Sequence, residues 1–177
     1  MSKKIAMVIA KEGFRKEELL VPKSILENAG FTISIVSSEL GNAVGYPNET
    51  IIPIDLVFDE VSPQEFEAII FVGGKGAEEL FDDEQAHVVA KLFSKQGKLV
   101  AAICAASVIL ARAGLLEGKK ATCFSLYQPD LERRKAIYTG TSVEQDDLVI
   151  TASGPEAATE FGEKIRETLL EQHTTLL

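Results

Sequence analysis

The sequence contains few of the residues that form covalent cross-links and metal sites. Its 177 residues include two cysteines, Cys104 and Cys123, two histidines, His87 and His173, and no tryptophan. Two distant cysteines do not make a disulfide scaffold, and they lack the close spacing of a zinc or dithiol redox motif. Two histidines also exclude a histidine-rich metal site. We therefore expect no metal and no cofactor.

Positive charge and long apolar runs are equally scarce. The chain has 18 Lys and Arg against 27 Asp and Glu, a formal net charge of −9. An acidic chain without a basic stripe is poorly suited to nucleic acid or to anionic lipid. The longest uncharged run, 99–111, is shorter than the ~20 residues of a membrane span. The apolar run 5–10 is too short for a secretion signal. We expect a cytoplasmic protein that binds neither nucleic acid nor membrane.

Length and composition indicate one globular domain. Hydrophobic residues make up 46% of the chain and charged residues 25%, which are ordinary values for a folded protein. A chain of this length buries enough surface to fold without a disulfide or a metal. We assign residues 1–172 to a single domain and 173–177 to a short C-terminal tail in which disorder is expected.

Buried strand-like runs alternate with segments of helical period. The pattern predicts strands at 5–10, 31–36, 50–52, 68–72, 98–103, 120–124 and 148–151, helices at 15–28, 77–81, 84–96, 105–113 and 154–172, and a turn region at 41–48. Long connections between buried strands imply an α/β fold with a mostly parallel sheet and helices on both faces. In such sheets the ligand site lies at the carboxyl ends of the strands.

The strongest local signal is a cysteine between a predicted strand and a predicted helix. Cys104 has small residues two positions before and after it, Ala102 and Ala106, as a nucleophile elbow requires. At a helix N-terminus the dipole and free amides should lower the pKa of Cys104 below the ordinary value of roughly 8.5. The alternative is a small buried residue at a strand end.

A glycine-rich loop follows another predicted strand on the same edge of the sheet. Gly73, Gly74 and Gly76 can present backbone amides to a ligand. The amides of Gly74 and Ala105 could together stabilise an oxyanion beside the cysteine. The alternative is a simple tight turn.

The first predicted helix begins with several acidic residues. Glu17 and Glu18 can complement the helix dipole, or one of them can point inward towards Cys104. His87 and His173 follow no strand and are not placed as catalytic bases. Cys123 is a core residue or a resolving thiol near Cys104.

Taken together these segments resemble the ThiJ/PfpI superfamily, in particular its parkinsonism-associated deglycase branch. The matching stretches are residues 10–11 (AK), 18–22 (ELLVP), 72–77 (VGGKGA), 100–106 (VAAICAA) and 150–155 (ITASGP). The resemblance covers nearly the whole chain. It implies a flavodoxin-like three-layer sandwich, a reactive Cys104, a protonated Glu18 beside it, oxyanion donors at Gly74 and Ala105, and a homodimer.

The resemblance leaves three functions open. The first is cysteine-dependent chemistry on small reactive carbonyls or modified protein side chains, as in a glyoxalase or deglycase. The second is a non-enzymatic redox sensor or chaperone that uses oxidation of Cys104. The third, a cysteine peptidase or amidase, is disfavoured because Ala105 stands where the peptidase-like branch has histidine. Phe124 likewise stands where the deglycase branch often has histidine, so no histidine is available as a base.

Overall fold

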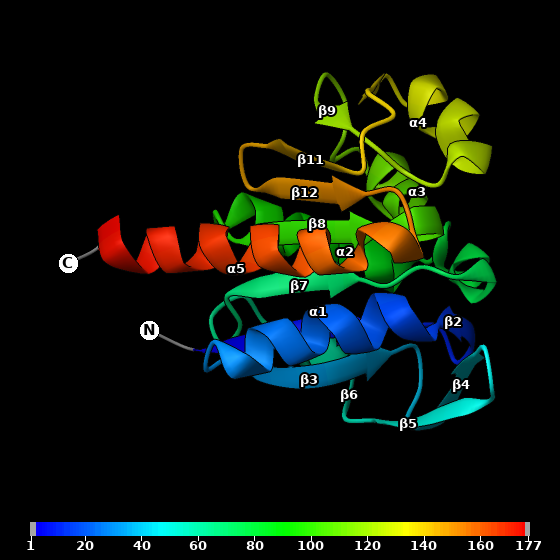
Figure 1. Cartoon of the computed structure of the whole chain (residues 1–177), viewed down its shortest axis with the longest axis vertical. Coiled ribbons are helices and arrows are strands. Elements are labelled where there is room, and N and C mark those ends of the chain that lie inside the picture. Colours follow the sequence, from blue (N-terminus) through cyan, green and yellow to red (C-terminus); the bar gives the residue numbers. More distant parts are fainter. Residues whose placement is uncertain (1–2, 176–177) are drawn as a thin grey trace.

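The computed structural model describes residues 3–175, in which a seven-stranded sheet lies between two layers of helices (Figure 1). The strand order is β11-β12-β8-β7-β1-β3-β6. All neighbours are parallel except the β11–β12 pair. The strands of this sheet are β1 (Lys4–Val8), β3 (Thr32–Ser37), β6 (Leu56–Val57), β7 (Ala68–Phe71), β8 (Leu99–Ile103), β11 (Val143–Asp146) and β12 (Val149–Ala152). This is the flavodoxin-like sandwich expected from the sequence.

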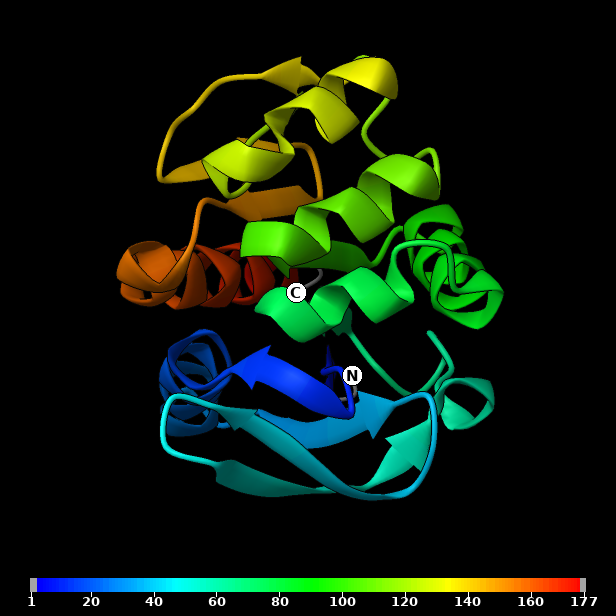
Figure 2. The same cartoon turned by 90° about the vertical axis from the view of Figure 1, so that its right-hand side faces the viewer.

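The central strands are apolar on both faces because helices cover both faces. Every residue of β7, β8 and β12 is buried, as in sheets built from parallel crossovers. Figure 2 shows α1 (Lys16–Asn28) and α5 (Ala158–Thr175) on one side of the sheet and α2 (Glu84–Lys95) on the other. The short α3 (Ser107–Arg112) packs with α2, and α4 (Gln128–Arg133) packs with α3.

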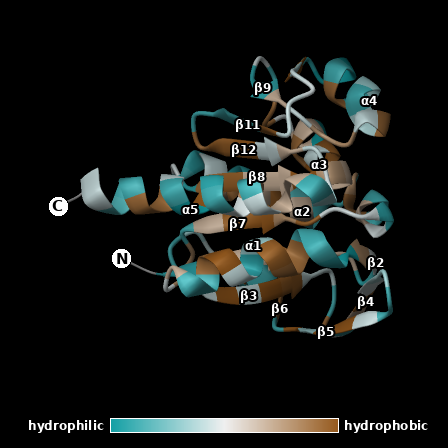
Figure 3. Ribbon diagram, in the orientation of Figure 1, coloured by the Kyte–Doolittle hydropathy of each residue, from teal (hydrophilic) through white to brown (hydrophobic). Residues whose placement is uncertain are grey.

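Hydropathy follows these layers. Figure 3 shows that the central strands are mostly hydrophobic and that the helices combine hydrophobic and hydrophilic residues. In α1 the buried residues are Glu18, Leu19, Pro22 and Leu26, a spacing that places them on one face of the helix. Glu18 is the one charged residue on that face, and it lies at the end of α1 nearest the carboxyl ends of the strands. The fold therefore buries a carboxyl group where a ligand site is expected.

Two small sheets accompany the main one. β2 (Glu12–Arg15), β4 (Gly41–Tyr46) and β5 (Thr50–Ile54) form a three-stranded sheet. β9 (Lys120–Ala121) and β10 (Ile137–Tyr138) form a short parallel pair. The turn predicted at 41–48 is therefore wrong for most of its length, because β4 pairs with both β2 and β5. The strand predicted at 120–124 is limited to two residues and lies outside the main sheet.

Five short 3-10 turns connect the described elements: η1 (Phe58–Glu60), η2 (Lys75–Leu80), η3 (Cys104–Ala106), η4 (Ser125–Tyr127) and η5 (Pro155–Ala157). They replace the helix predicted at 77–81 and the beginnings of those predicted at 105–113 and 154–172. The disorder expected from residue 173 is also wrong, because α5 continues to Thr175. Residues 176–177 of the predicted tail lie outside the described residues.

Candidate functional site

Cys104 stands at a sharp turn between β8 and η3. Its φ of 63° lies in the left-handed region, which is strained for a residue with a Cβ. Ala102 and Ala106 are fully buried on either side of the turn, so no larger side chain obstructs it. Cys104 itself is 8% exposed. This is the backbone geometry expected of a nucleophile elbow.

The glycine loop after β7 makes room for two side chains. A Cβ on Gly73 would lie 2.4 Å from Glu18 Oε2 and 2.7 Å from Cys104 Cβ. The Gly73 carbonyl accepts a hydrogen bond from the Arg15 amide at 3.0 Å, which joins the loop to the residue before α1. Glycine at this position therefore allows the carboxyl of α1 and the cysteine of β8 to approach one another.

Glu18 is a buried acid beside the cysteine. Its side chain is 0% exposed. Among the described residues neither carboxyl oxygen has a hydrogen-bond partner of good geometry, although the Cys104 thiol and the Gly73 amide are close enough to oppose the rise in its pKa. Burial raises the pKa of Glu18 from 4.5 to about 7, because an ionised carboxylate loses its hydration. Near neutral pH Glu18 can both donate and accept a proton.

Burial also raises the pKa of the Cys104 thiol. Burial, and then the neighbouring Glu18, raise the pKa of Cys104 from 9.0 to about 12. The expected lowering by a helix dipole is therefore wrong. Cys104 begins a single 3-10 turn followed by the six-residue α3, and so short a helical segment does not offset desolvation. Burial thus disfavours the charged form of both groups.

Two backbone amides face the sulfur. The amides of Gly74 and Ala105 hydrogen-bond towards Cys104 and partly counter the rise in its pKa. Gly74 has a φ of 103°, and a Cβ there would lie 2.5 Å from the Arg15 nitrogen, so only glycine fits. Amides in this position can hold an oxygen that becomes negative during attack on a carbonyl. The structure thus brings together Cys104, Glu18, Gly74 and Ala105, while their roles stay predictions.

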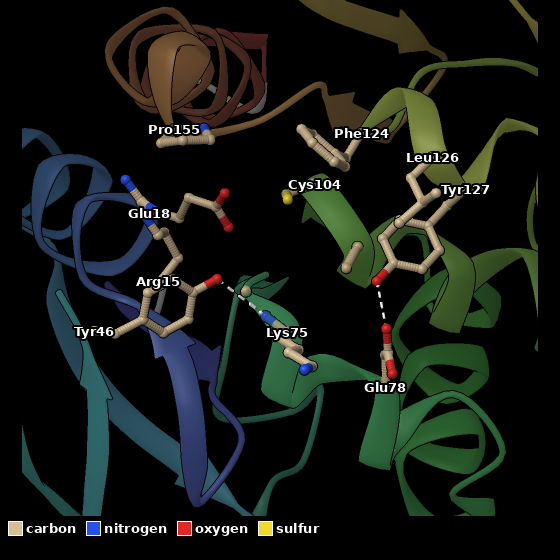
Figure 4. A pocket seen from close by; sticks show the side chains of 12 residues that line it. Arg15, Glu18, Tyr46, Lys75, Glu78, Cys104, Phe124, Leu126, Tyr127 and Pro155 are labelled. Atoms are coloured by element: carbon tan, nitrogen blue, oxygen red, sulfur yellow. Dashed lines mark hydrogen bonds between the residues drawn. The ribbon is translucent and has the colours of Figure 1, made fainter.

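A cavity of about 310 Å³ opens in front of Cys104 (Figure 4). Its floor is the Cys104–Glu18 pair, and its mouth carries the exposed apolar side chains of Phe124 and Leu126. The residues that line it are Arg15, Glu18, Tyr46, Gly74, Lys75, Glu78, Cys104, Ala105, Phe124, Leu126, Tyr127 and Pro155. A cavity of this size accommodates a small molecule or an extended side chain.

Sequence reasoning did not anticipate several polar residues at the cavity. Arg15 donates to Glu17 at 2.7 Å and stacks on the Tyr46 ring. The Tyr46 hydroxyl accepts a hydrogen bond from the Lys75 amide at 3.1 Å, and the Tyr127 hydroxyl donates to Glu78 at 2.6 Å. Tyr46 ends β4, the segment that the sequence indicated as a turn. The one available signal for Tyr127 was its place in the chain, because η4 begins shortly after β9 ends.

The remaining candidates lie elsewhere or stay open. His87 is on α2, where its ring nitrogen contacts the Phe81 carbonyl at 2.8 Å. His173 contacts Glu67. Both cysteines are free and buried, and a resolving role for Cys123 stays a prediction. Across residues 3–175 no group of three or more His, Cys, Asp or Glu is arranged to hold a metal ion. No helix in that range has the length and apolar character needed to cross a bilayer.

A mostly parallel sheet with helices on both faces places the chain among the flavodoxin-like α/β proteins. Residues 3–168 match the DJ-1/PfpI family, and the chain belongs to that family. It is 30% identical to a deglycase of Thermococcus kodakarensis over 149 residues, which are 84% of this chain and 89% of the relative.

Solved structures agree with this assignment. A ThiJ/PfpI domain protein from Brachyspira murdochii has a TM-score of 0.93 and 33% identity, covering 96% of this chain and 98% of the other. Drosophila melanogaster DJ-1beta has a TM-score of 0.85 and 27% identity, covering 96% and 91%. The fold, with its sheet and surrounding helices, is therefore shared across these proteins.

Proposed function

We propose that this protein is a deglycase-like or glyoxalase-like enzyme that uses Cys104 to act on small reactive carbonyls or on the protein side chains they modify. The observation that carries the proposal is a buried Glu18, with a pKa raised to about 7 by burial, beside an elbow cysteine at the floor of an open cavity. The deglycase names of several relatives support it. A homodimer, on the family resemblance alone, and a cytoplasmic location, as expected from the short apolar runs, also belong to the proposal.

The first chemical step follows from the protonation of the pair. Cys104 Sγ bonds to an aldehyde carbon, the thiol proton passes to the Glu18 carboxylate, and the carbonyl electron pair moves to oxygen. The amides of Gly74 and Ala105 hold the resulting oxyanion, and Glu18 returns the proton to give a hemithioacetal. A thiol with a raised pKa is a weak nucleophile until its proton is taken. The adjacent carboxylate therefore acts as the activating base.

With a 2-oxoaldehyde such as methylglyoxal, the same carboxyl can complete an internal redox step. Glu18 removes the C–H proton of the hemithioacetal carbon and returns a proton to the neighbouring carbon. As the hydroxyl proton of the first carbon passes to the oxygen of the second, the first carbon is oxidised to a thioester and the second is reduced to an alcohol. Water then releases a 2-hydroxy acid and restores the Cys104 thiol. The overall reaction consumes one water and needs no external oxidant.

The test is methylglyoxal turnover by wild type, Cys104→Ser, Glu18→Gln and Glu17→Gln. Cys104→Ser should be inactive, and Glu18→Gln should lose about 10²-fold or more because it cannot transfer a proton. Glu17→Gln is the matched control, since Glu17 pairs with Arg15 and does not line the cavity. In wild type the rate should rise through about pH 7 as Glu18 ionises. Equal activities of the Glu17 and Glu18 variants would reject Glu18 as the acid–base group.

A second candidate function is redox sensing or chaperone activity through Cys104. The absence of histidine from the cavity lining favours it, because oxidation needs no base beyond the Glu18 carboxylate that takes the thiol proton. Peroxide would convert Cys104 to a sulfinate, and protonated Glu18 would donate a hydrogen bond to a sulfinate oxygen. Selective addition of two oxygen atoms to Cys104 rather than Cys123, with no methylglyoxal turnover, would favour this function. Glu18→Leu should lose that selectivity.

A further inference from the structure

A tyrosine and a glutamate form a hydrogen-bonded pair on the side of the cavity away from Glu18. Tyr127 is the last residue of η4, and its hydroxyl donates to Glu78 Oε1 at 2.6 Å. Glu78 lies in η2, the turn that begins directly after Gly74. Both side chains line the cavity in front of Cys104. Figure 4 shows Glu18 on one side of Cys104 and Tyr127 on the other.

Neighbouring side chains hold the tyrosine ring in place. The Phe81 ring meets the Tyr127 ring edge-on, with centroids 5.5 Å apart. The Arg112 guanidinium lies 5.1 Å from the centre of Phe81. Arg112 in turn donates to Asp82 at 2.7 Å and to Asp130 at 3.0 Å. A phenol held from two sides offers its oxygen at a fixed place, which is a requirement for a proton-transfer group.

The chemistry of the pair is that of a proton acceptor. Tyr127 has one hydroxyl proton, which it donates to the Glu78 carboxylate, so its oxygen lone pairs remain free to accept a proton. Glu78 is exposed and can pass a proton to solvent. Burial, then Glu78, and then charge at Cys104 raise the pKa of Tyr127. The phenol therefore stays protonated at neutral pH and is electrostatically coupled to the sulfur.

We propose that Tyr127 and Glu78 take the proton from the water that hydrolyses the Cys104 thioester, in the place of the missing histidine. This inference rests on the proposed carbonyl chemistry. The water oxygen bonds to the thioester carbon, its proton passes to the Tyr127 oxygen, and the Tyr127 proton passes to Glu78. The C–S bond then breaks, Glu18 takes a proton from solvent and gives it to the departing Cys104 sulfur, and Glu78 returns its proton to solvent. Tyr127 is the catalytic residue of this step, and Glu78 acts through it as a positioning residue and proton acceptor.

The experiment separates formation of the Cys104 adduct from its hydrolysis. Wild type, Tyr127→Phe and Glu78→Gln are mixed with methylglyoxal, and both the adduct on the intact protein and steady-state turnover are followed by mass spectrometry. Adduct formation should keep its wild-type rate in both variants. Its hydrolysis should slow by about 10²-fold, so that acylated protein accumulates. Hydroxylamine, a nucleophile that needs no base, should discharge the adduct equally from all three.

Two variants serve as controls. Tyr138→Phe changes a tyrosine outside the cavity, and Glu79→Gln changes the exposed neighbour of Glu78; both should hydrolyse the adduct at the wild-type rate. Wild-type hydrolysis in Tyr127→Phe would overturn the inference and leave the proposed function intact. Loss of adduct formation in Tyr127→Phe would assign Tyr127 a structural role and would also overturn the inference. Absence of both adduct and turnover in wild type would reject the proposed function itself.

Discussion

Glu18 affects the stability of the folded chain as well as the chemistry of its site. Its pKa is raised from 4.5 to about 7 by burial, so the folded state binds a proton more tightly than the unfolded state. Stability falls with rising pH wherever the folded state holds the extra proton. The contribution of Glu18 is therefore favourable at low pH, and it is lost as the pH rises from about 4.5 to about 7.

We expect Glu18→Gln to remove this pH dependence. Between pH 4.5 and pH 8 the stability of wild type relative to Glu18→Gln should fall by up to about 3 kcal/mol, because one pKa unit corresponds to 1.36 kcal/mol. Urea unfolding at the two pH values measures the difference. A constant difference between the two proteins would contradict a raised pKa for Glu18.

Glu17→Gln is the internal control for that measurement. Partial burial raises the pKa of Glu17, but its own backbone hydrogen bond and Arg15 outweigh this effect and lower it overall. A carboxyl group with a lowered pKa in the folded state stabilises the fold above its unfolded pKa, and this stabilisation is lost as the pH falls. The Glu17 variant should therefore show a change of the opposite sign.

Three members of the candidate site could be predicted because each stands just after a strand: Cys104 and Gly74 follow β8 and β7, and Ala105 follows Cys104. Glu18 lies in the first turn of α1 beside Glu17, and only the family resemblance distinguished the two. The direction of the Cys104 pKa could not be predicted, because it depends on desolvation by residues distant in sequence. Tyr127 and Glu78 are 49 positions apart, and no local pattern joins them.

At the scale of elements, the glycine loop and β2 fit together without room for another atom. A Cβ on Gly76 would lie 1.8 Å from the Glu12 carbonyl oxygen. Gly76→Ala must therefore separate η2 from β2, with an overpacking cost of about 1–3 kcal/mol. Because η2 also carries Glu78 and begins after Gly74, turnover should fall as well. Thermal unfolding and methylglyoxal turnover measure the two effects.

The control for Gly76 is another glycine in a turn. Gly97 has a φ of 67° and nothing within 4 Å of its Cβ position. Gly97→Ala should cost about 1–2 kcal/mol from the left-handed backbone alone, and it should leave turnover per folded molecule unchanged. If Gly76→Ala retained wild-type turnover, the packing of η2 on β2 would not position the site.

Elements with strong local patterns were predictable, and those formed by distant pairing were not. α1 has a clear helical period, and the strands β1, β7 and β8 have continuous apolar runs. β4 has two glycines and few apolar residues, and it becomes a strand by pairing with β2 and β5. β2 spans four residues directly before α1. Such strands follow from tertiary contacts rather than propensity.

At the scale of the whole molecule, the candidate site lies at one end of the main sheet, and a contact of the last helix lies at the other. The candidate site occupies the carboxyl ends of the strands, while the ends of the described chain lie at the opposite side (Figure 1). There His173, near the end of α5, contacts the carboxyl of Glu67 and packs on the Phe31 ring with centroids 5.9 Å apart. Glu67 directly precedes β7, so this contact joins the last helix to a central strand.

His173→Ala should destabilise the fold without affecting the site. Glu67 is 7% exposed, and its Oε1 has no hydrogen-bond partner among residues 3–175. Removing the imidazole would leave both carboxyl oxygens buried and unpaired, at a cost of about 1–3 kcal/mol. Glu171→Ala is the control on the exposed side of the same helix end. Urea unfolding should separate the two variants. In a protein that already carries Glu67→Leu, His173→Ala should cost less stability, because no carboxyl remains to be left unpaired. Equal stability of His173→Ala and Glu171→Ala would show that α5 is held in place by its remaining contacts with α1 and the sheet.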